Sequence, residues 1–180
     1  MNTYIALLRG INVSGHNKIK MAELKHTLET GGLHRVQTYI QSGNVLFQSD
    51  DDADTLRLII EGLIQRVFGI SITVIIRTAA EFAHIVAACP FAGILLSKGE
   101  SIHVSVLTEA PSQKVVDLLS TSERAQDEYA IHGKEIYFLF RQSILDSKLA
   151  KNLQKLGNTA TTRNWNTIQK LDSLAKTMQA

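Results

Sequence analysis

Strand-like and helix-like segments follow one another in the same order twice along this chain of 180 residues. Short apolar runs and alternation indicate the strands, and apolar residues three and four positions apart indicate the helices. The first series comprises a strand at 4–8, a helix at 21–30, strands at 36–41 and 44–48, a helix from the acids at 50–52 to Gly69, and a strand at 72–77. The second comprises a strand at 102–107, a helix opened by Pro111 and Ser112, strands at 129–131 and 135–140, a helix at 145–156 with Leu145, Leu149, Leu153 and Leu156 in register, and a strand at 159–162. The repeated order predicts two consecutive units of the form βαββαβ.

The two expected hairpins also share residue types, which favours a duplication. Three positions recur at a spacing of 90 residues: Tyr39, Gly43 and Phe47, matched by Tyr129, Gly133 and Tyr137. A connecting helix at 79–88 and a last helix from about Asn164 to Met178 complete the chain. We therefore expect an α+β protein of two ferredoxin-like units, with residues 1–78 in the first unit, 79–100 as the connection, and 101–180 in the second unit together with the C-terminal helix.

The predicted topology brings two separate polar segments to one edge of the first sheet. A βαββαβ unit folds as an antiparallel sheet with both helices on one face, and right-handed crossovers place the third strand between the first and the second. The loop that leaves the first strand then lies at the same end of the sheet as the first hairpin. The candidate ligand-binding residues at this edge are Arg9, Gly10, Asn12, Gln41, Ser42 and Asn44.

These residues have simpler interpretations as well. Gly10 and Gly15 have the separation of a phosphate-binding loop, but His16 and Asn17 stand where that motif needs Lys and Ser or Thr. The glycines then only provide turns with positive φ. Ser42 and Gly43 form a hairpin turn rather than the strand-to-helix elbow of serine hydrolases, so Gln41 and Asn44 have an alternative role in hydrogen-bonding the turn backbone.

A second candidate anion site lies at the start of the last helix. Arg163, Asn164 and Asn166 surround Trp165, and Thr161 or Thr162 is the expected helix cap. The free N–H groups of a helix start and an arginine together favour an anion. The alternative is that Trp165 anchors the helix in the core while the asparagines satisfy loop backbone.

The composition excludes several classes of protein. A net charge of +2 does not indicate a nucleic-acid or membrane partner, and the single cysteine, Cys89, excludes an internal disulfide. The N-terminus has no signal-peptide pattern and no apolar run has the length of a membrane span, so we expect a cytoplasmic protein with no membrane association. The six histidines show no metal-ligand spacing, and we predict neither a metal site nor a cofactor.

Three segments resemble a known family. They are LRGINV at 8–13 with KIKM at 18–21, TYIQSGNV at 38–45, and TTRNWNT at 161–167. These motifs are similar to those of the bacterial domain-of-unknown-function family 1697, and the similarity runs from near Tyr4 to near Leu174. The resemblance implies an α+β fold related to the ferredoxin-like type and implies no activity. Ser14 stands where that family more often has glycine.

Three functional hypotheses follow. The first is a binding protein that holds a small anionic or nucleotide-like ligand, since amides and guanidinium groups recognise such groups but do not titrate near pH 7. The second is an enzyme in which Ser42 or His16 is the reacting group beside oriented donors. The third is an RNA-binding module that uses the open sheet face. We rank it last because Tyr4 and Phe47 are the only aromatic residues in the relevant strands of the first unit, and no RNP-like aromatic pattern occurs. A homodimer through exposed sheet faces is a further possibility.

Overall fold

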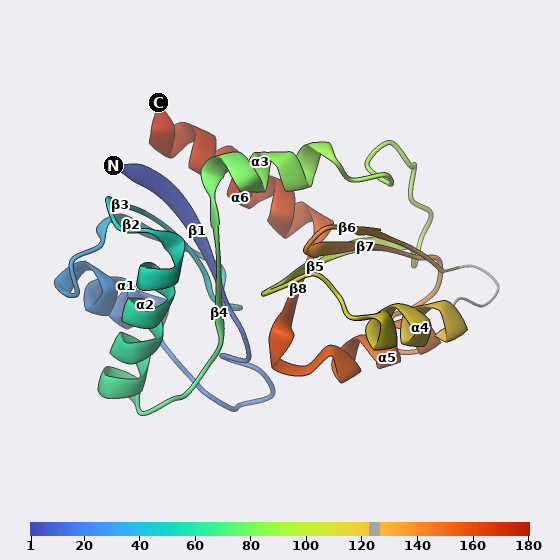
Figure 1. Ribbon diagram of the computed structural model, residues 1–180, viewed down its shortest axis with the longest axis horizontal. Helices are drawn as coiled ribbons and strands as arrows, with labels where there is room; N and C mark the ends of the chain where they lie inside the picture. Colours follow the sequence, from blue (N-terminus) through green and yellow to red (C-terminus); the bar gives the residue numbers. More distant parts are fainter. Residues whose placement is uncertain (123–126) are drawn as a thin grey trace. The chain divides into compact units, whose positions relative to one another are not determined.

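The computed structural model describes residues 1–122 and 127–180, and the chain divides into two compact units (Figure 1). Unit 1 comprises Met1–His84 together with Gln169–Ala180, and unit 2 comprises Ile85–Ile168. The chain leaves unit 1 within helix α3 (Ala79–Ala87) and returns to it within helix α6 (Trp165–Gln179). The sequence-based division places the whole C-terminal helix in the second unit, whereas the structure assigns the helix from Gln169 onward to unit 1.

Unit 1 contains the first predicted βαββαβ series. Its elements are β1 (Asn2–Leu8), α1 (Met21–Thr30), β2 (His34–Tyr39), β3 (Asn44–Ser49), α2 (Ala53–Phe68) and β4 (Val74–Thr78). The four strands form an antiparallel sheet in the order β2-β3-β1-β4, with Leu7 opposite Asn44 and Leu8 opposite Val74. The predicted position of the third strand between the first and second is therefore confirmed.

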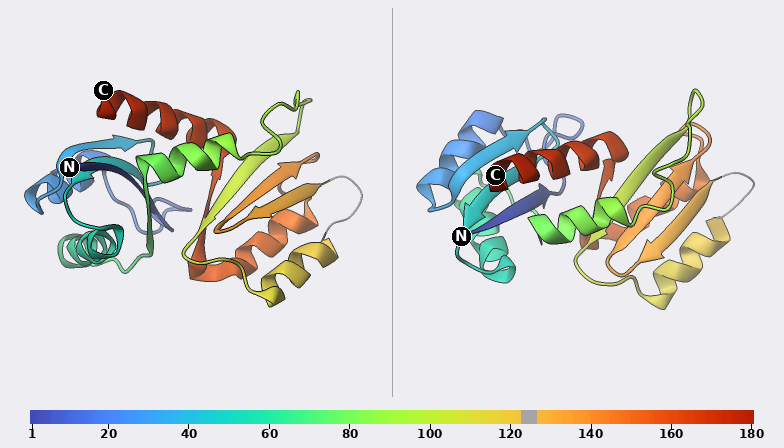
Figure 2. Two further views of the ribbon diagram at one scale, coloured as in Figure 1. Left: turned by 45° about the horizontal axis from the view of Figure 1, so that its top comes forward. Right: turned by 90° about the horizontal axis from the view of Figure 1, so that it is seen from above.

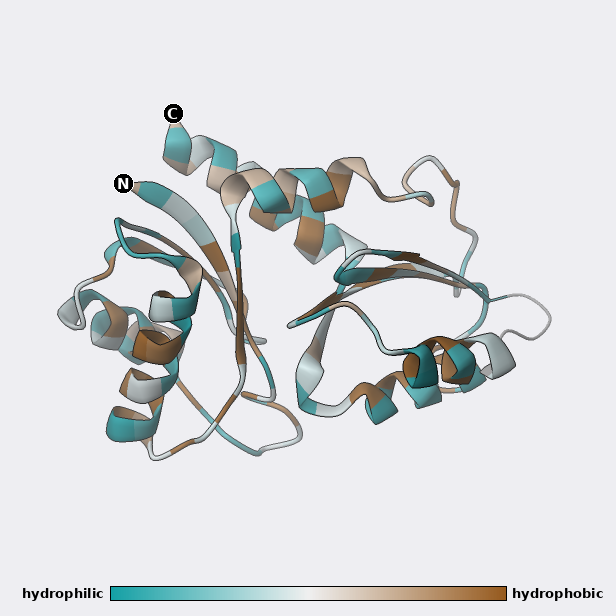
Figure 3. Ribbon diagram, viewed as in Figure 1, coloured by the Kyte–Doolittle hydropathy of each residue, from teal (hydrophilic) through white to brown (hydrophobic). Residues whose placement is uncertain are grey.

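The helices of unit 1 bury one face of this sheet. Leu56, Ile60 and Ile64 recur along α2 at helical spacing and are fully buried, because their spacing puts them on the stripe that faces the strands. The helix begins where the Asp52 carboxylate accepts a hydrogen bond from Thr55 N, and it ends at Gly69 with a φ of 67°. Figure 3 shows the resulting pattern of hydrophobic strands and helices of alternating hydropathy.

The C-terminal end of α6 is attached to the sheet of unit 1 by hydrogen bonds. The carbonyl oxygen of Met178 accepts from Arg35 Nη1 at 2.7 Å and from Gln48 Nε2 at 3.4 Å. Arg35 lies in β2 with a φ of 49°, at the point where the pairing of β2 with β3 shifts register. These bonds link residues more than 100 positions apart, which is why the sequence pattern assigned the helix to the other unit.

Unit 2 repeats the arrangement. Its elements are β5 (Ser101–Leu107), α4 (Gln113–Ser122), β6 (Glu128–His132), β7 (Glu135–Phe140), α5 (Lys148–Leu153), the 3-10 helix η1 (Gln154–Thr159) and β8 (Ala160–Asn164). The sheet order β6-β7-β5-β8 is equivalent to that of unit 1. Helices α4 and α5 lie together on one side of this sheet, over a core that contains Leu107, Phe138 and Leu149 (Figure 2). The predicted α+β fold of two ferredoxin-like units is confirmed.

The predicted start of the helix at Leu145 is wrong. Leu145 is 83% exposed, and the helix begins only at Lys148. Ser147 caps it by accepting a hydrogen bond from Ala150 N, while its own hydroxyl donates to the buried carboxylate of Asp127 at 2.7 Å. This bond to a distant aspartate fixes the first residue of the helix. The spacing of the leucines gives no information about it.

The 90-residue spacing of the two hairpins is also wrong in detail. Leu8 N donates to the carbonyl oxygen of Gly43, and the equivalent bond in unit 2 runs from Leu107 N to the carbonyl oxygen of Lys134. The third strands are therefore offset by 91 residues, and Phe47 corresponds to Phe138, which like Phe47 faces the core beside the helices. The repetition lies in the order of the elements and not in those three matched residues.

Candidate functional site

The loop after β1 and the hairpin between β2 and β3 are neighbours in unit 1, as predicted. Leu8 N lies 2.8 Å from the carbonyl oxygen of Gly43, and Asn12 Nδ2 lies 2.8 Å from the carbonyl oxygen of Gln41. Gly43 has a φ of 90°, and a side-chain carbon added there would lie 2.8 Å from Leu8 Cβ. Only glycine allows the hairpin tip to approach the loop this closely.

Asn12 holds the loop in a fixed conformation. Its amide nitrogen donates to the carbonyl oxygens of Ile19 and Gln41, and its amide oxygen accepts from Ile19 N at 2.8 Å. Ile11 and Ile19 are buried in the core of the unit and anchor both halves of the loop. Five loop residues have a positive φ between 49° and 78°: Gly10, Asn12, Ser14, Gly15 and Asn17. Asparagine tolerates this conformation, so the residue types match the backbone that they adopt.

The loop is basic. Residues 9–20 contain Arg9, Lys18 and Lys20 together with His16, and they contain no aspartate or glutamate. His16 and both lysines are exposed, and Arg9 is half-buried. A run of cations without an acid creates a positive local potential, which favours an anion. This charge pattern was present in the sequence but is only meaningful once the loop is known to be one folded segment.

Ser42 and Asn44 act within the hairpin. Asn44 is fully buried, and its amide nitrogen donates to the carbonyl oxygen of Tyr39 and to Ser42 Oγ, both at 2.9 Å. Ser42 thus accepts a hydrogen bond from the Asn44 amide. An amide cannot act as a general base, so Asn44 does not remove the proton of the Ser42 hydroxyl. This part of the edge is occupied with positioning the turn, as the alternative interpretation of the sequence expected. Arg9 and Gln41 remain at the surface of the candidate site, half-buried and exposed respectively.

The second candidate, at the start of α6, has a different geometry from the expected one. Arg163 lies inside β8 opposite Val104, is only 9% exposed, and donates to Thr161 Oγ1 at 2.7 Å and to the carbonyl oxygen of Thr162. Burial lowers the pKa of its guanidinium to about 10. The helix cap is not Thr161 or Thr162 but Asn164, whose Oδ1 accepts from Thr167 N at 2.9 Å.

Asn166 is exposed in the first turn of α6, whereas Trp165 is buried. The tryptophan therefore anchors the helix, and the arginine is held within the sheet. These contacts match the structural interpretation of this segment more closely than an exposed anion site.

The two aromatic residues in the strands considered for RNA binding belong to the core. Tyr4 and Phe47 are buried and stack on each other with ring centroids 5.6 Å apart. Stacking of RNA bases needs exposed rings on the sheet surface. These two residues give no support to that hypothesis.

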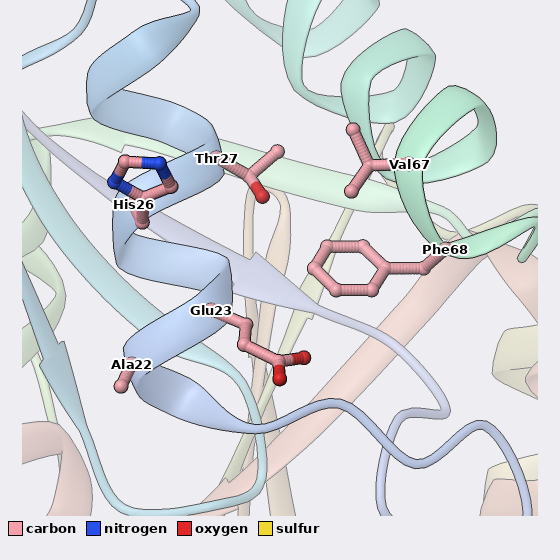
Figure 4. Close-up of a pocket in the computed structure, with 6 residues that line it drawn as sticks. All are labelled: Ala22, Glu23, His26, Thr27, Val67 and Phe68. Atoms are coloured by element: carbon pink, nitrogen blue, oxygen red, sulfur yellow. The ribbon is translucent and has the colours of Figure 1, made fainter.

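A groove between α1 and the end of α2 was not found from the sequence. Figure 4 shows its lining, which consists of Ala22, Glu23, His26 and Thr27 from α1 and Val67 and Phe68 from α2. Its volume is about 470 Å³. The two helix segments are about 40 residues apart in the chain and share no motif, so no pattern could have joined them. The carboxylate of Glu23 makes this groove unsuitable as an extension of the basic loop.

Two further structural properties bear on the kind of site. Within residues 1–122 and 127–180, no three His, Cys, Asp or Glu side chains lie together in a position to hold a metal ion. None of the helices described for this chain is long and apolar enough to cross a membrane.

The fold and the loop define a class of α+β proteins with two ferredoxin-like units, the first of which carries an elaborated strand-to-helix loop. Residues 1–137 match the model of a family described as protein of unknown function (DUF1697), and the chain belongs to this family. It is similar to a solved structure described as the conserved bacterial protein SP0830 from Streptococcus pneumoniae, with 26% identity and a TM-score of 0.79. The similarity covers 97% of this chain and 98% of that one. No curated protein matches the chain.

Proposed function

We propose that unit 1 binds a small anionic, nucleotide-like ligand at the basic loop formed by residues 9–20, beside the hairpin tip at 40–43. The observation that supports this proposal is the charge of the loop. Three cations and no acid occur in a segment that Asn12, Ile11 and Ile19 hold in place. A fixed loop orders its cations before the ligand arrives, which lowers the entropic cost of binding.

The chemistry of the side chains favours binding over catalysis. Arg9 offers a planar fork of donors for a phosphate or carboxylate, and Lys18 and Lys20 offer mobile ammonium groups. Guanidinium and ammonium groups donate hydrogen bonds and accept none, which suits them to holding an anion rather than to removing a proton. The proposal places the protein in a reducing cytosol, since its only cysteine, Cys89, is free and buried.

Calorimetric titration with inorganic pyrophosphate tests the proposal. We expect measurable binding by the natural chain and a loss of about tenfold or more in affinity for the double variant Arg9→Ala, Lys18→Ala, which corresponds to about 1.4 kcal/mol. Lys134→Ala is the matched control, because Lys134 is an exposed lysine in the equivalent hairpin of unit 2. Equal affinity in the double variant and the control would contradict the proposed site. Absence of binding at millimolar pyrophosphate and low salt would contradict the proposed function itself.

A further inference from the structure

The hairpin tip beside the basic loop contains a strained and exposed aliphatic residue. Ile40 has a φ of 48° and is 49% exposed. A β-branched residue is rarely found in the left-handed region, because its Cβ approaches the following carbonyl oxygen. Asparagine or glycine would adopt the same backbone with less strain and would also expose less apolar surface. The backbone conformation of the hairpin therefore gives no reason for isoleucine at this position.

A second exposed aliphatic residue lies in the adjoining loop. Val13 is 56% exposed. It directly follows Asn12, and Ile40 directly precedes Gln41, so the two residues flank the hydrogen bond between Asn12 Nδ2 and the carbonyl oxygen of Gln41. The bond brings both aliphatic residues to the place where the loop and the hairpin meet. Gln41 itself is an exposed residue.

Backbone strain and exposed apolar surface together indicate a role in binding rather than in stability. Strained residues persist where function requires them, and isolated exposed aliphatics alone need no explanation. Here two exposed aliphatic residues, Ile40 and Val13, lie next to a loop that contains three cations, and the backbone of Ile40 is also strained. A ligand that only carried an anionic group would gain nothing from them.

We infer that the ligand is a mononucleotide, whose phosphate binds the cations of the loop and whose base packs against Ile40 and Val13. This inference rests on the proposed anion site. Apolar side chains pack against the flat faces of bases, and a carboxamide such as that of Gln41 can pair with both a donor and an acceptor on an adenine edge. Ribose 5-phosphate has the same anionic group without the base, so it separates the two parts of the interaction.

The test compares AMP with ribose 5-phosphate by calorimetry on the full chain. We expect the natural protein to bind AMP at least about tenfold more tightly than ribose 5-phosphate. Ile40→Asn should reduce this preference to less than about threefold while leaving the affinity for ribose 5-phosphate unchanged. Its melting temperature should stay the same or rise, because asparagine relieves the left-handed strain. Leu58→Asn is the control, since Leu58 is 62% exposed on α2 of the same unit.

Each outcome decides the inference. Equal affinity of the natural protein for AMP and ribose 5-phosphate overturns the mononucleotide assignment while the anion site stands. An undiminished preference in Ile40→Asn, or the same loss in Leu58→Asn, overturns the role of Ile40. If neither AMP, ribose 5-phosphate nor pyrophosphate binds, the inference fails together with the proposed function.

Discussion

The two units share a strand order but differ in the connection from the first strand to the first helix. In unit 1 this connection is residues 9–20, twelve in all, with three cations and no acid. In unit 2 it is residues 108–112, which contain Glu109 and no cation. The topology is therefore satisfied by five residues. The longer basic loop is an addition to one copy of a repeated fold, and this difference places the proposed site in unit 1.

The two units also differ in the packing around their hairpin glycines. Gly43 is enclosed by Leu8 and Ile11, whereas a side chain at Gly133, the glycine of the unit 2 hairpin, would meet nothing within 4 Å. Unit 1 thus packs Leu8 and Ile11 closely against its hairpin glycine, whereas the glycine of the unit 2 hairpin lies in open space, although the backbone bond from the strand to the hairpin occurs in both units. The close packing around Gly43 is therefore a second difference between the two units, and it lies beside the same basic loop.

Alanine substitution of the two hairpin glycines, Gly43 and Gly133, should give the largest difference in stability between the two units. Gly43→Ala adds a methyl group at 2.8 Å from Leu8 Cβ and also forces alanine into a positive φ. We expect a loss of about 2–4 kcal/mol in the free energy of unfolding, from left-handed strain and overpacking together. Gly133→Ala has only the strain, at a φ of 59°, and should lose about 1 kcal/mol. Urea denaturation measures both, and equal losses would show that the hairpin of unit 1 is not tightly packed.

Alanine substitution of the two candidate arginines, Arg9 and Arg163, should give a smaller difference in stability. Arg163→Ala leaves the acceptors at Thr161 and Thr162 without this donor and should cost about 1–3 kcal/mol of stability. Arg9→Ala should change thermal stability little and should weaken pyrophosphate binding instead. Thermal melting and calorimetry on both variants distinguish these effects. If Arg163→Ala kept its stability but lost anion binding, Arg163 would be part of the anion-binding site.

The pH dependence of stability should give the smallest effect, and it should originate in unit 2. Burial lowers the pKa of His103, and its Nδ1 is buried without a hydrogen-bond partner among the residues that the structure describes. As the pH drops below about 6.5, His103 gains a proton in the unfolded chain but stays neutral in the folded chain. The free energy of unfolding therefore falls with the pH in this range. The loss cannot exceed about 1.4 kcal/mol per pH unit for one group.

The histidine comparison uses denaturation at pH 7.5 and pH 5.5. His103→Gln should lose part of the pH dependence seen in the natural chain. His132→Gln is the control, because His132 is exposed and packs edge-on against Tyr137 much as His103 packs against Phe140. An identical pH profile in His103→Gln and the natural chain would remove His103 as the cause.

Element order and sheet order could be predicted from the sequence because both follow from local patterning and from the handedness of crossovers. The approach of residues 9–12 to residues 41–44 followed from the same rules. The start of α5 could not be predicted, since a hydrogen bond from Ser147 to Asp127, twenty residues away, determines it. Leucine spacing alone extended the helix to Leu145, which is exposed.

The roles of the individual polar residues were less predictable than their positions. Asn12 and Asn44 were expected at the edge, and both lie there, but their amides bond the backbone. Arg163 was expected at a helix start and instead lies buried in a strand. Sequence patterns report spacing along one element, whereas these roles depend on which distant segment comes within hydrogen-bond distance.

The most direct test of the proposed site is a titration of isotope-labelled protein with pyrophosphate, followed through the backbone amide signals in NMR spectra. We expect the amides of residues 9–20 and 40–44 to shift together and to reach saturation. Those of the equivalent segments in unit 2, residues 108–112 and 132–135, should stay in place. Shifts in the segments of unit 2, shifts spread evenly over the surface, or no shift at all would contradict the proposed site.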